Sequence, residues 1–341
     1  MKRVKQIVIS VLLLPLLGMA VPDVGLEELL GDQSGPFVVH LNCGKGEQTA
    51  ELLKRDGIIV QGLDTDRTRI DAARKSASAR KDYGERITFS WFDGKHLPFI
   101  DNSVNTIVAN GKSQVTADEI LRVLTPRGIA HINGKKIVKP WPSDIDEWTH
   151  HMHGPDNNRV ANDSRIKPRL SHLQWTVGPR YTRHHEHMSS FSAMVSSGGK
   201  IFYIADEGLV DTVLLPSDWN LVARDAFNGL ELWRIKLDKW FDQLWTFKSG
   251  PFVVTRRLVA DGDRLYAAME MGGRLSVLDA NTGDVLYELP GTEQVEEILV
   301  DGDRVMVVKR EWLSRGRFLG DARNRKKLDG SAWDKVGGKQ S

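Results

Sequence analysis

Short apolar runs separated by helix-like stretches dominate the first part of the chain. The runs of strand type are residues 37–41 (FVVHL), 58–63, 87–91, 104–108 and 128–133. The helix-like stretches between them are residues 47–55, 67–81 and 117–123. Strands that alternate with helices pair in parallel and are joined by right-handed crossovers. Residues 36–138 are therefore predicted to form an α/β Rossmann-like domain around an open parallel sheet.

The pattern changes after Lys139-Pro140-Trp141-Pro142, where two prolines interrupt both helix and strand. Short alternating strands with turn signals follow. The segments DAFNGLELW (residues 225–233) and DANTGDVLY (residues 279–287) resemble each other, and the Asp-Gly-Asp turn at 261–263 returns at 301–303. A period near 40 residues with four short strands is typical of a β-propeller blade. Residues 139–195 then read as a linker and lead-in segment, and residues 196–310 as propeller repeats.

The number of repeats is small. About two full blades and the start of a third fit between Ser196 and Val308, whereas closed propellers have about 4–8 blades. An unclosed arc leaves an edge strand open to pairing. We expect residues 311–341, which are rich in charge, to be a polar, disordered tail. We also expect the chain to be part of a longer protein or a truncated gene product, with completion by oligomerisation as the alternative.

The N-terminus has the layout of a secretory signal. Lys2, Arg3 and Lys5 precede an apolar stretch at residues 7–17, and small residues follow at positions 18 and 20. The stretch is shorter than the ~20 residues that a spanning helix needs. The sequence predicts a signal peptide over residues 1–20 and export to the periplasm. The alternatives are an uncleaved signal anchor, peripheral association with a membrane, or a helix packed on the protein.

Composition narrows the function classes. The chain has 47 Lys and Arg residues and 45 Asp and Glu residues, and this near-balance of charge means that nucleic acid is not expected as a partner. Apolar residues at 40% and charged residues at 27% exclude a disordered chain. The single cysteine, Cys43, excludes an internal disulfide and a four-cysteine zinc site. The expected partners are a small-molecule or a protein ligand.

Two glycines and two acids follow the predicted strands of the first domain. Gly44 and Gly46 follow the first strand, Asp64 ends the second, and Asp93 follows the third. Ligands of open parallel sheets bind at the carboxyl ends of the strands. Glycines let a ligand approach the backbone closely, and a carboxylate can accept both hydroxyl protons of a ribose. The carboxylate of Asp93 can accept a hydrogen bond from an exocyclic adenine amine. A dinucleotide fingerprint fails, because its third glycine position is Thr49.

These segments resemble class I S-adenosylmethionine-dependent methyltransferases of the small-molecule type. The similarity rests on VVHLNCGKGEQTAELL, VQGLDTD, FDGKHLPFIDNSVNTIVAN and LTPRGIAHI. It implies that Gly44 and Gly46 face the methionine part of the cofactor, that Asp64 holds the ribose and that Asp93 holds the adenine amine. Asn110, at the end of the fourth strand, lies where the family faces its substrate. Two departures are Cys43, where the family often has a smaller residue, and the little room after Asn133 for a final antiparallel hairpin and substrate lid.

The later repeats resemble the pyrroloquinoline-quinone-like (PQQ-like) propellers of quinoprotein alcohol dehydrogenases and outer-membrane assembly proteins. The pattern Asp-Ala-x-x-Gly-x-x-Leu-Trp carries this similarity. Many such propellers bind no quinone, and no adjacent cysteine pair or calcium constellation accompanies the repeats. The aromatics Trp233 and Tyr287 are expected to pack between neighbouring blades.

Seven of the ten histidines lie between residues 150 and 187, and six of them form two tight groups at 150–153 and 184–187. In strands, His151 and His153 share one face, as do His185 and His187. Imidazole suits zinc, copper or iron, so these four are candidate metal ligands. The alternatives are a polar, hydrogen-bonded network that caps the propeller, or a catalytic base.

Three functions remain open from the sequence. The first is a methyltransferase that uses S-adenosylmethionine, with the propeller recruiting substrate. The second is an exported binding or assembly module without catalysis. The third is an oxidoreductase that depends on PQQ or a metal. Whether the chain is an enzyme at all is left open, and no catalytic base can be named.

Overall fold

In the computed structural model, the described residues are 36–54, 57–165, 173–178, 190–210, 216–237, 240, 252–270 and 272–309. The predicted signal peptide, the predicted polar tail, and His185 and His187 lie outside them. Among the residues that the structure describes, no helix combines the length and apolar character needed to span a membrane.

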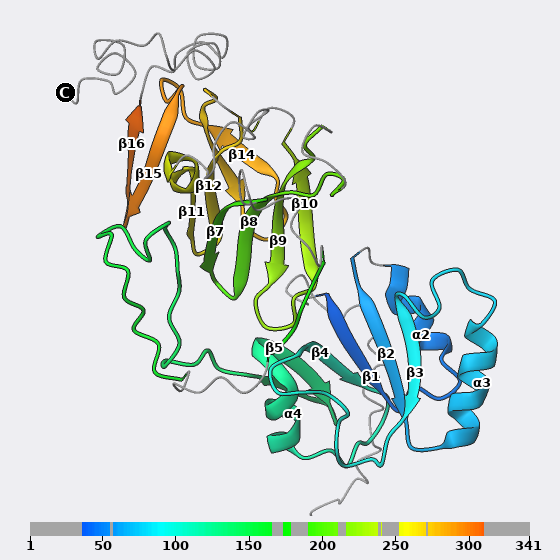
Figure 1. Ribbon diagram of the computed structural model, residues 1–341. Coiled ribbons are helices and arrows are strands. Elements are labelled where there is room, and N and C mark those ends of the chain that lie inside the picture. Colours follow the sequence, from blue (N-terminus) through cyan, green and yellow to red (C-terminus); the bar gives the residue numbers. More distant parts are fainter. Residues whose placement is uncertain are drawn as a thin grey trace, which may run out of the picture.

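The first domain contains a six-stranded sheet in the order β3-β2-β1-β4-β5-β6 (Figure 1). The five predicted strands are all present and parallel. Their bounds, with that of the sixth strand, are β1 (Phe37–Leu41), β2 (Ile59–Asp64), β3 (Ile87–Trp91), β4 (Val104–Ala109), β5 (Leu124–Ile132) and β6 (Lys135–Val138). The strand order reverses between β1 and β4, so a topological switch point lies at their carboxyl ends.

Strand β6 corrects one expectation from the sequence. It pairs antiparallel with β5, so the chain does form a final hairpin after Asn133. The turn needs only Asn133 and Gly134, both at positive φ (54° and 70°), which is the backbone of a tight two-residue hairpin. Because an Asn-Gly pair adopts this backbone at little cost, four further residues are enough to complete the hairpin.

Helices cover both faces of the sheet. On one face lie α2 (Glu47–Glu51), which continues as a 3₁₀ turn, and α3 (Arg67–Ala77), whose Ile70 and Ala73 pack against Val38 and Val60. On the other face lies α4 (Ala117–Val123), which buries Ile120 and Val123. Asp66 and Thr116 cap the last two helices by accepting backbone N–H groups. Along β1, Val38 packs in the core on the side of α3, whereas Val39 and Leu41 pack in the core on the side of α4. This alternation confirms an α/β fold with helices on both faces of the sheet.

The second domain is an arc of antiparallel sheets. Blade 1 contains β7 (Phe191–Ser197), β8 (Lys200–Asp206), β9 (Trp219–Asp225) and β10 (Glu231–Lys236). Blade 2 contains β11 (Leu258–Asp261), β12 (Arg264–Ala268), β13 (Leu275–Asp279) and β14 (Val285–Glu288). A two-stranded third blade contains β15 (Val295–Asp301) and β16 (Arg304–Lys309). Two blades and the start of a third are thus confirmed, although blade 1 begins at Phe191 and not at Ser196.

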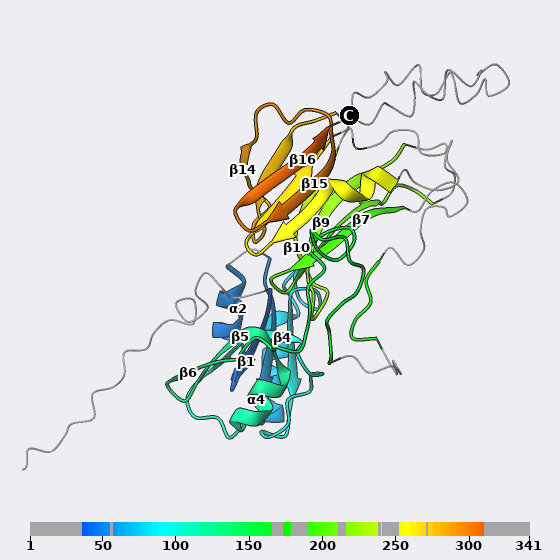
Figure 2. The same cartoon turned by 90° about the vertical axis from the view of Figure 1, so that its left-hand side faces the viewer.

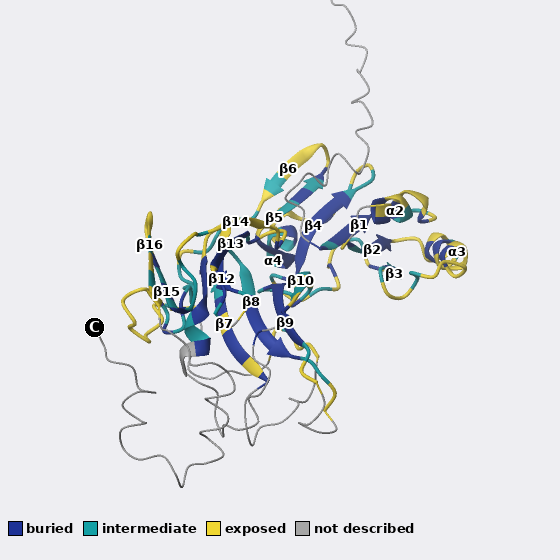
Figure 3. Cartoon of the chain, turned by 90° about the horizontal axis from the view of Figure 1, so that it is seen from above, coloured by how far each residue is buried: buried dark blue, intermediate teal, exposed yellow. Residues whose placement is uncertain are grey.

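Apolar cores join neighbouring blades. Phe202, Leu221 and Ala223 of blade 1 pack with Leu265 and Leu278 of blade 2 in one buried cluster. A second cluster joins blade 2 to β15. Figure 3 shows buried strands through the middle of the arc and a largely exposed β16 at its end. The arc therefore has a solid interior but ends in an exposed strand.

The two domains meet through a turn of blade 1 (Figure 2). Asn105, at the start of β4, donates from Nδ2 to Asp225 Oδ2 at 2.6 Å. Asn228 donates from Nδ2 to Asn105 Oδ1 at 2.9 Å and to Ser103 O at 3.1 Å. Asn105 and Asp225 are each only 8% exposed. Because β4 begins at Val104, the propeller arc contacts the amino edge of the parallel sheet.

Candidate functional site

Four loops come together at the carboxyl edge of the sheet. Strand pairing places Leu41 beside Leu63 and Ala109, and Asp64 beside Trp91. The chain segments after these four strand ends therefore lie side by side. We call this region the carboxyl-edge site and define it by Asn42, Gly44, Asp64, Asp93 and Asn110. The sequence predicted Gly44, Asp64 and Asp93, together with Gly46, as cofactor-binding residues and Asn110 separately as facing the substrate. Strand pairing brings the corresponding strand ends to one edge.

Asp64 is the buried anchor of this site, with 2% of its surface exposed. Its Oδ2 accepts from the backbone N–H of Gly44 at 2.9 Å, and its Oδ1 accepts from that of Asp66 at 2.9 Å. The Arg69 guanidinium lies 3.9 Å from Oδ2. The carboxylate therefore holds the loops after β1 and β2 in place. Since each carboxylate oxygen has two acceptor sites, each keeps one for a ligand hydroxyl.

The two glycines of the first loop have different surroundings. Gly44, at φ 59°, has no heavy atom within 4 Å of the position that a Cβ would take. A Cβ on Gly46 would lie 2.5 Å from the Phe89 ring, and one on Gly62 would lie equally close to that ring. Gly44 thus borders open space that a ligand could enter. At Gly46, by contrast, a side chain would collide with Phe89, so packing alone requires glycine there.

Asp93 lies in the loop after β3 and makes local bonds. Its Oδ1 accepts from the backbone N–H groups of Lys95 (2.8 Å) and His96 (2.7 Å), and its Oδ2 lies 2.6 Å from His96 Nδ1. These hydrogen bonds hold the pKa of Asp93 well below its usual range, and the bond from the His96 side chain has the largest effect. The carboxylate is ionised and its side chain is 43% exposed, so it can still accept from a ligand.

Asn110 links the loops on either side of the switch point. Its Nδ2 donates to Gln48 Oε1, and its backbone O accepts from Asn42 Nδ2 at 2.9 Å. Asn42 Nδ2 also donates to Lys112 O at 3.0 Å. Asn42 has φ 56°, a left-handed conformation that asparagine tolerates better than most residues. The sequence analysis missed Asn42, although its place at a strand end before two glycines was a usable signal.

His40 on β1 is a second residue that the sequence analysis missed. Its side chain is fully buried, with Nδ1 2.8 Å from Thr49 Oγ1. Burial lowers its pKa to about 4, although Asn110 and Asp64 both act in the opposite direction. Its Nε2 has no hydrogen-bond partner among the described residues. His40 is thus a neutral imidazole beneath the carboxyl-edge site. Because His40 lies within an apolar strand pattern, the sequence did not indicate that this residue lies beneath the site.

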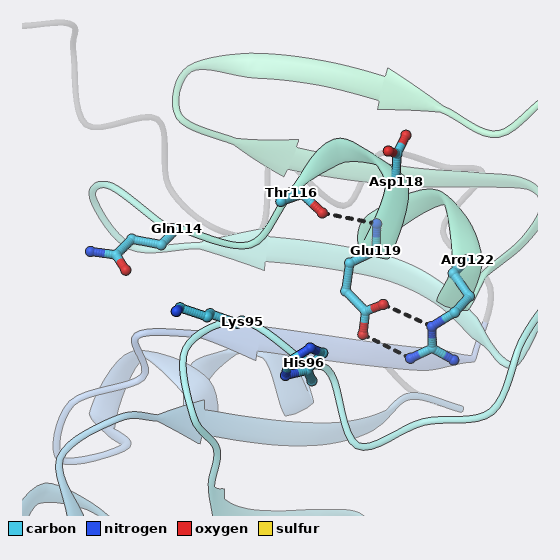
Figure 4. A pocket seen from close by; sticks show the side chains of 7 residues that line it. All are labelled: Lys95, His96, Gln114, Thr116, Asp118, Glu119 and Arg122. Carbon is cyan, nitrogen blue, oxygen red and sulfur yellow. Dashed lines mark hydrogen bonds and ion pairs between the residues drawn. The ribbon is translucent and has the colours of Figure 1, made fainter.

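Beside Asp93 lies a cavity of about 480 Å³ (Figure 4). Side chains from the loop after β3 and from the start of α4 line it, namely Lys95, His96, Gln114, Thr116, Asp118, Glu119 and Arg122. Glu119 binds Arg122 at 2.8 Å and accepts from Leu97 N at 2.7 Å, so the inner wall is held by internal bonds. Lys95, His96 and Gln114 remain as groups that could contact a small polar molecule.

The first histidine group contributes to packing of the propeller. His150 Nε2 accepts from the backbone N–H of Val300 at 3.0 Å, and its Nδ1 is 2.8 Å from Thr149 Oγ1. His153 Nε2 lies 2.8 Å from Asp146 Oδ2. Burial lowers the pKa of His150 and of His151, which favours neutral rings. No set of three or more metal-ligating side chains comes together within the described ranges.

The segment that carries these histidines connects all three blades. Trp148 exchanges hydrogen bonds with Ser196 of β7, Thr149 O accepts from Ala260 N of β11, and His150 accepts from Val300 N of β15. Each bond reaches the first strand of a different blade. The polar network that the sequence analysis weighed against metal binding is therefore present at His150 and His153.

Comparison with known families identifies two regions. The methyltransferase-domain family model matches residues 38–128. The family model described as outer membrane protein assembly factor BamB, whose repeats are PQQ-like, matches residues 217–324. The chain therefore carries a methyltransferase-like α/β domain followed by PQQ-like propeller repeats, as the sequence motifs indicated.

Individual relatives are each similar to about 30% of this chain. Methyltransferase GfsG of Streptomyces halstedii is 31% identical over 110 residues, which are 30% of this chain and 39% of that protein. The chain thus aligns with well under half of that relative's length. Among solved structures, the [4+2]-cyclase SpnF is 26% identical over 31% of this chain and 42% of that one, with a TM-score of 0.27. Geranyl diphosphate methyltransferase in complex with S-adenosylmethionine is 20% identical over 31% and 46%, with a TM-score of 0.28.

Proposed function

We propose that the methyltransferase-like domain binds S-adenosylmethionine at the carboxyl-edge site and transfers its methyl group to a small molecule. The observation that carries the proposal is Asp64, a buried carboxylate with one acceptor site free on each oxygen, next to the open space at Gly44. The match of residues 38–128 to a methyltransferase domain supports the same ligand.

Each residue of the site has a part in this proposal. Asp64 accepts from the ribose hydroxyls, Asp93 accepts from the adenine amine, and the backbone at Gly44 and Gly46 borders the methionine part. Asn110, tied to Gln48 and Asn42, lies on the side from which an acceptor approaches. The cofactor supplies an electrophilic methyl group. The chain contributes position and orientation, which is the main requirement for an in-line transfer.

Isothermal calorimetry with S-adenosylhomocysteine tests cofactor binding. We expect Asp64→Ala to weaken binding at least about 100-fold, since hydrogen bonds to a charged group contribute about 1.5–3 kcal/mol each. Asp66→Ala is the matched control: Asp66 caps α3 through Thr68 N but directs its carboxylate to the helix, so affinity should change less than about threefold. Absence of binding to the wild-type chain, or equal losses in both folded variants, would refute the proposal.

A second candidate is an exported binding or assembly module without catalysis. It is favoured by the docking of the propeller on the amino edge, away from the carboxyl-edge site, and by the BamB description of the matched repeats. In this case the propeller binds a protein or small-molecule ligand in the periplasm or at a membrane surface. Fractionation of cells that express the full chain separates the candidates, because retention in the cytoplasm contradicts the second.

A further inference from the structure

The cavity beside Asp93 is separate from the carboxyl-edge site. It has a volume of about 480 Å³ and lies between the loop after β3 and the first turns of α4 (Figure 4). Among the described residues that line it, none belongs to the five that define the carboxyl-edge site. The first domain therefore has a second place that can hold a small molecule, next to the proposed cofactor contacts and not part of them.

One wall of this cavity has its charges already balanced. Arg122 donates to Glu119 from Nε and from Nη2 at 2.8 Å each, and from Nη1 to Asp101 Oδ1 at 2.8 Å. Glu119 Oε1 also accepts from Leu97 N at 2.7 Å. The guanidinium and the two carboxylates satisfy one another, so this wall does not require a charged ligand.

The other side of the cavity offers donors that are not yet used. Lys95 Nζ and the Gln114 carboxamide make no hydrogen bond or ion pair with any residue that the structure describes. Figure 4 shows the ends of both side chains extending to the same side of the cavity, whereas Asp118, the remaining acid of the lining, directs its carboxylate away from them. An ammonium group and amide N–H groups with no acid between them favour an anionic ligand.

His96 connects the cavity to the carboxyl-edge site. Its ring lines the cavity, and its Nδ1 lies 2.6 Å from Asp93 Oδ2. When the ring is protonated, both nitrogens are donors, so it can bond an anion through Nε2 and Asp93 through Nδ1 at the same time. An anion in the cavity would thus hold His96 on Asp93, where it occupies an acceptor site of the carboxylate that the proposed adenine contact needs.

We propose that this cavity binds a small organic anion, whose carboxylate or phosphate group lies between Lys95, Gln114 and His96, and that the bound anion weakens cofactor binding at Asp93. The anion site stands on the cavity itself, whereas the coupling rests on the proposed function. The volume leaves room for an organic body beside the anionic group. Because coupling between two binding sites is reciprocal, the cofactor weakens binding of the anion by the same factor.

Nuclear magnetic resonance of the full chain labelled with ¹⁵N-histidine tests the anion site. The His96 signal is identified by its loss in His96→Asn, and the other histidine signals report whether each variant is folded. Citrate and glycerol 3-phosphate are added separately at constant ionic strength. We expect the His96 signal to shift and saturate with a Kd of about 1 mM for at least one of them. The probe that binds more tightly identifies the anionic group as a carboxylate or a phosphate.

Two lysine variants show whether the cavity is the site. Lys95→Ala should weaken binding of the anion about fivefold, the upper range for an exposed ion pair. Lys112→Ala is the matched control, because Lys112 is an exposed lysine in the loop of Gln114 that does not line the cavity. Its loss should change the Kd less than about twofold. Equal losses in the two variants, or shifts that do not saturate, would overturn the site.

Calorimetry with S-adenosylhomocysteine tests the coupling. Saturating anion should weaken its binding to the wild type about threefold to fivefold, compared with sodium chloride of the same ionic strength. In Lys95→Ala, the same anion concentration should have a smaller effect. An affinity that the anion leaves unchanged in the wild type would overturn the coupling. Absence of S-adenosylhomocysteine binding without any anion would instead refute the proposed function, while the histidine titration would still decide whether the anion site exists.

Discussion

The two edges of the six-stranded sheet are built in opposite ways. At the carboxyl edge, acids are held by backbone N–H groups, and open space borders Gly44. At the amino edge, Asn105 and Asp225 form a closed, buried contact between side chains of two domains. The propeller thus covers the edge at which parallel sheets seldom bind ligands and leaves the other edge free. Within the described residues, the carboxyl-edge site is built from side chains and backbone of the first domain alone.

The largest expected effect lies at the amino edge. Asp225→Ala should lower the free energy of unfolding by about 3 kcal/mol, because the buried Asn105 Nδ2 and the half-buried N–H groups of Phe227 and Asn228 lose this acceptor. Asp279→Ala is the matched control. Asp279 Oδ1 accepts from Asn281 and Thr282 in the same way, but these residues are exposed, so the loss should be about 1 kcal/mol. Urea unfolding of the full chain measures both.

A double-mutant cycle with Asn105→Ala sharpens this comparison. If Asp225 acts through the domain contact, the cycle should give a coupling energy of about 1–2 kcal/mol with Asn105 and none between Asn105 and Asp279. Equal losses for Asp225→Ala and Asp279→Ala, with no coupling, would mean that the turn matters only within its own blade.

The sequence predicted the features of the two edges that depend on local patterns, and it did not predict those that depend on contacts between residues distant in the chain. Alternating runs predicted all five parallel strands, and Asp64 and Asp93 were placed correctly at strand ends because a strand's end is a local property. The repeat motif predicted a turn, and the aromatic residues Trp233 and Tyr287 were expected to pack between neighbouring blades. Trp233 does so against Ala280 and Gly283, whereas Tyr287 is 47% exposed. That Asp225 in the first copy of this turn also contacts Asn105 was not predictable, because the two residues lie 120 positions apart. The same motif in the second copy uses Asp279 to accept from Asn281 and Thr282 of its own turn.

His40 shows the same limit at the carboxyl edge. It sits in an apolar strand, and only its burial beside Thr49 makes it sensitive to acid. Its folded-state pKa of about 4 lies below the ordinary 6.5, so protons bind the unfolded chain more tightly. The stability contribution is complete above about pH 6.5 and is lost progressively as pH falls toward 4. Between pH 7.5 and 5.5 we expect a loss of about 1 kcal/mol from this residue.

The variant His40→Asn isolates this effect. Asparagine keeps a polar atom near Thr49 Oγ1 but does not titrate, so the variant should lose about 1 kcal/mol less than the wild type over this pH interval. Urea unfolding at both pH values gives the difference directly. Parallel losses in the two proteins would show that His40 is not the group whose protonation destabilises the carboxyl edge.

The smallest expected effect concerns His96, which competes for Asp93. Oδ2 of Asp93 bonds His96 Nδ1 at 2.6 Å, and the proposed adenine amine needs an acceptor site on the same carboxylate. His96→Ala should therefore strengthen binding of S-adenosylhomocysteine by up to about fivefold, the range expected when one exposed hydrogen bond no longer competes for the carboxylate. Lys95→Ala is the control, because Asp93 accepts from the Lys95 backbone and not from its side chain. Weaker binding by His96→Ala would instead place the imidazole itself against the ligand, in the cavity that it lines with Lys95 and Gln114.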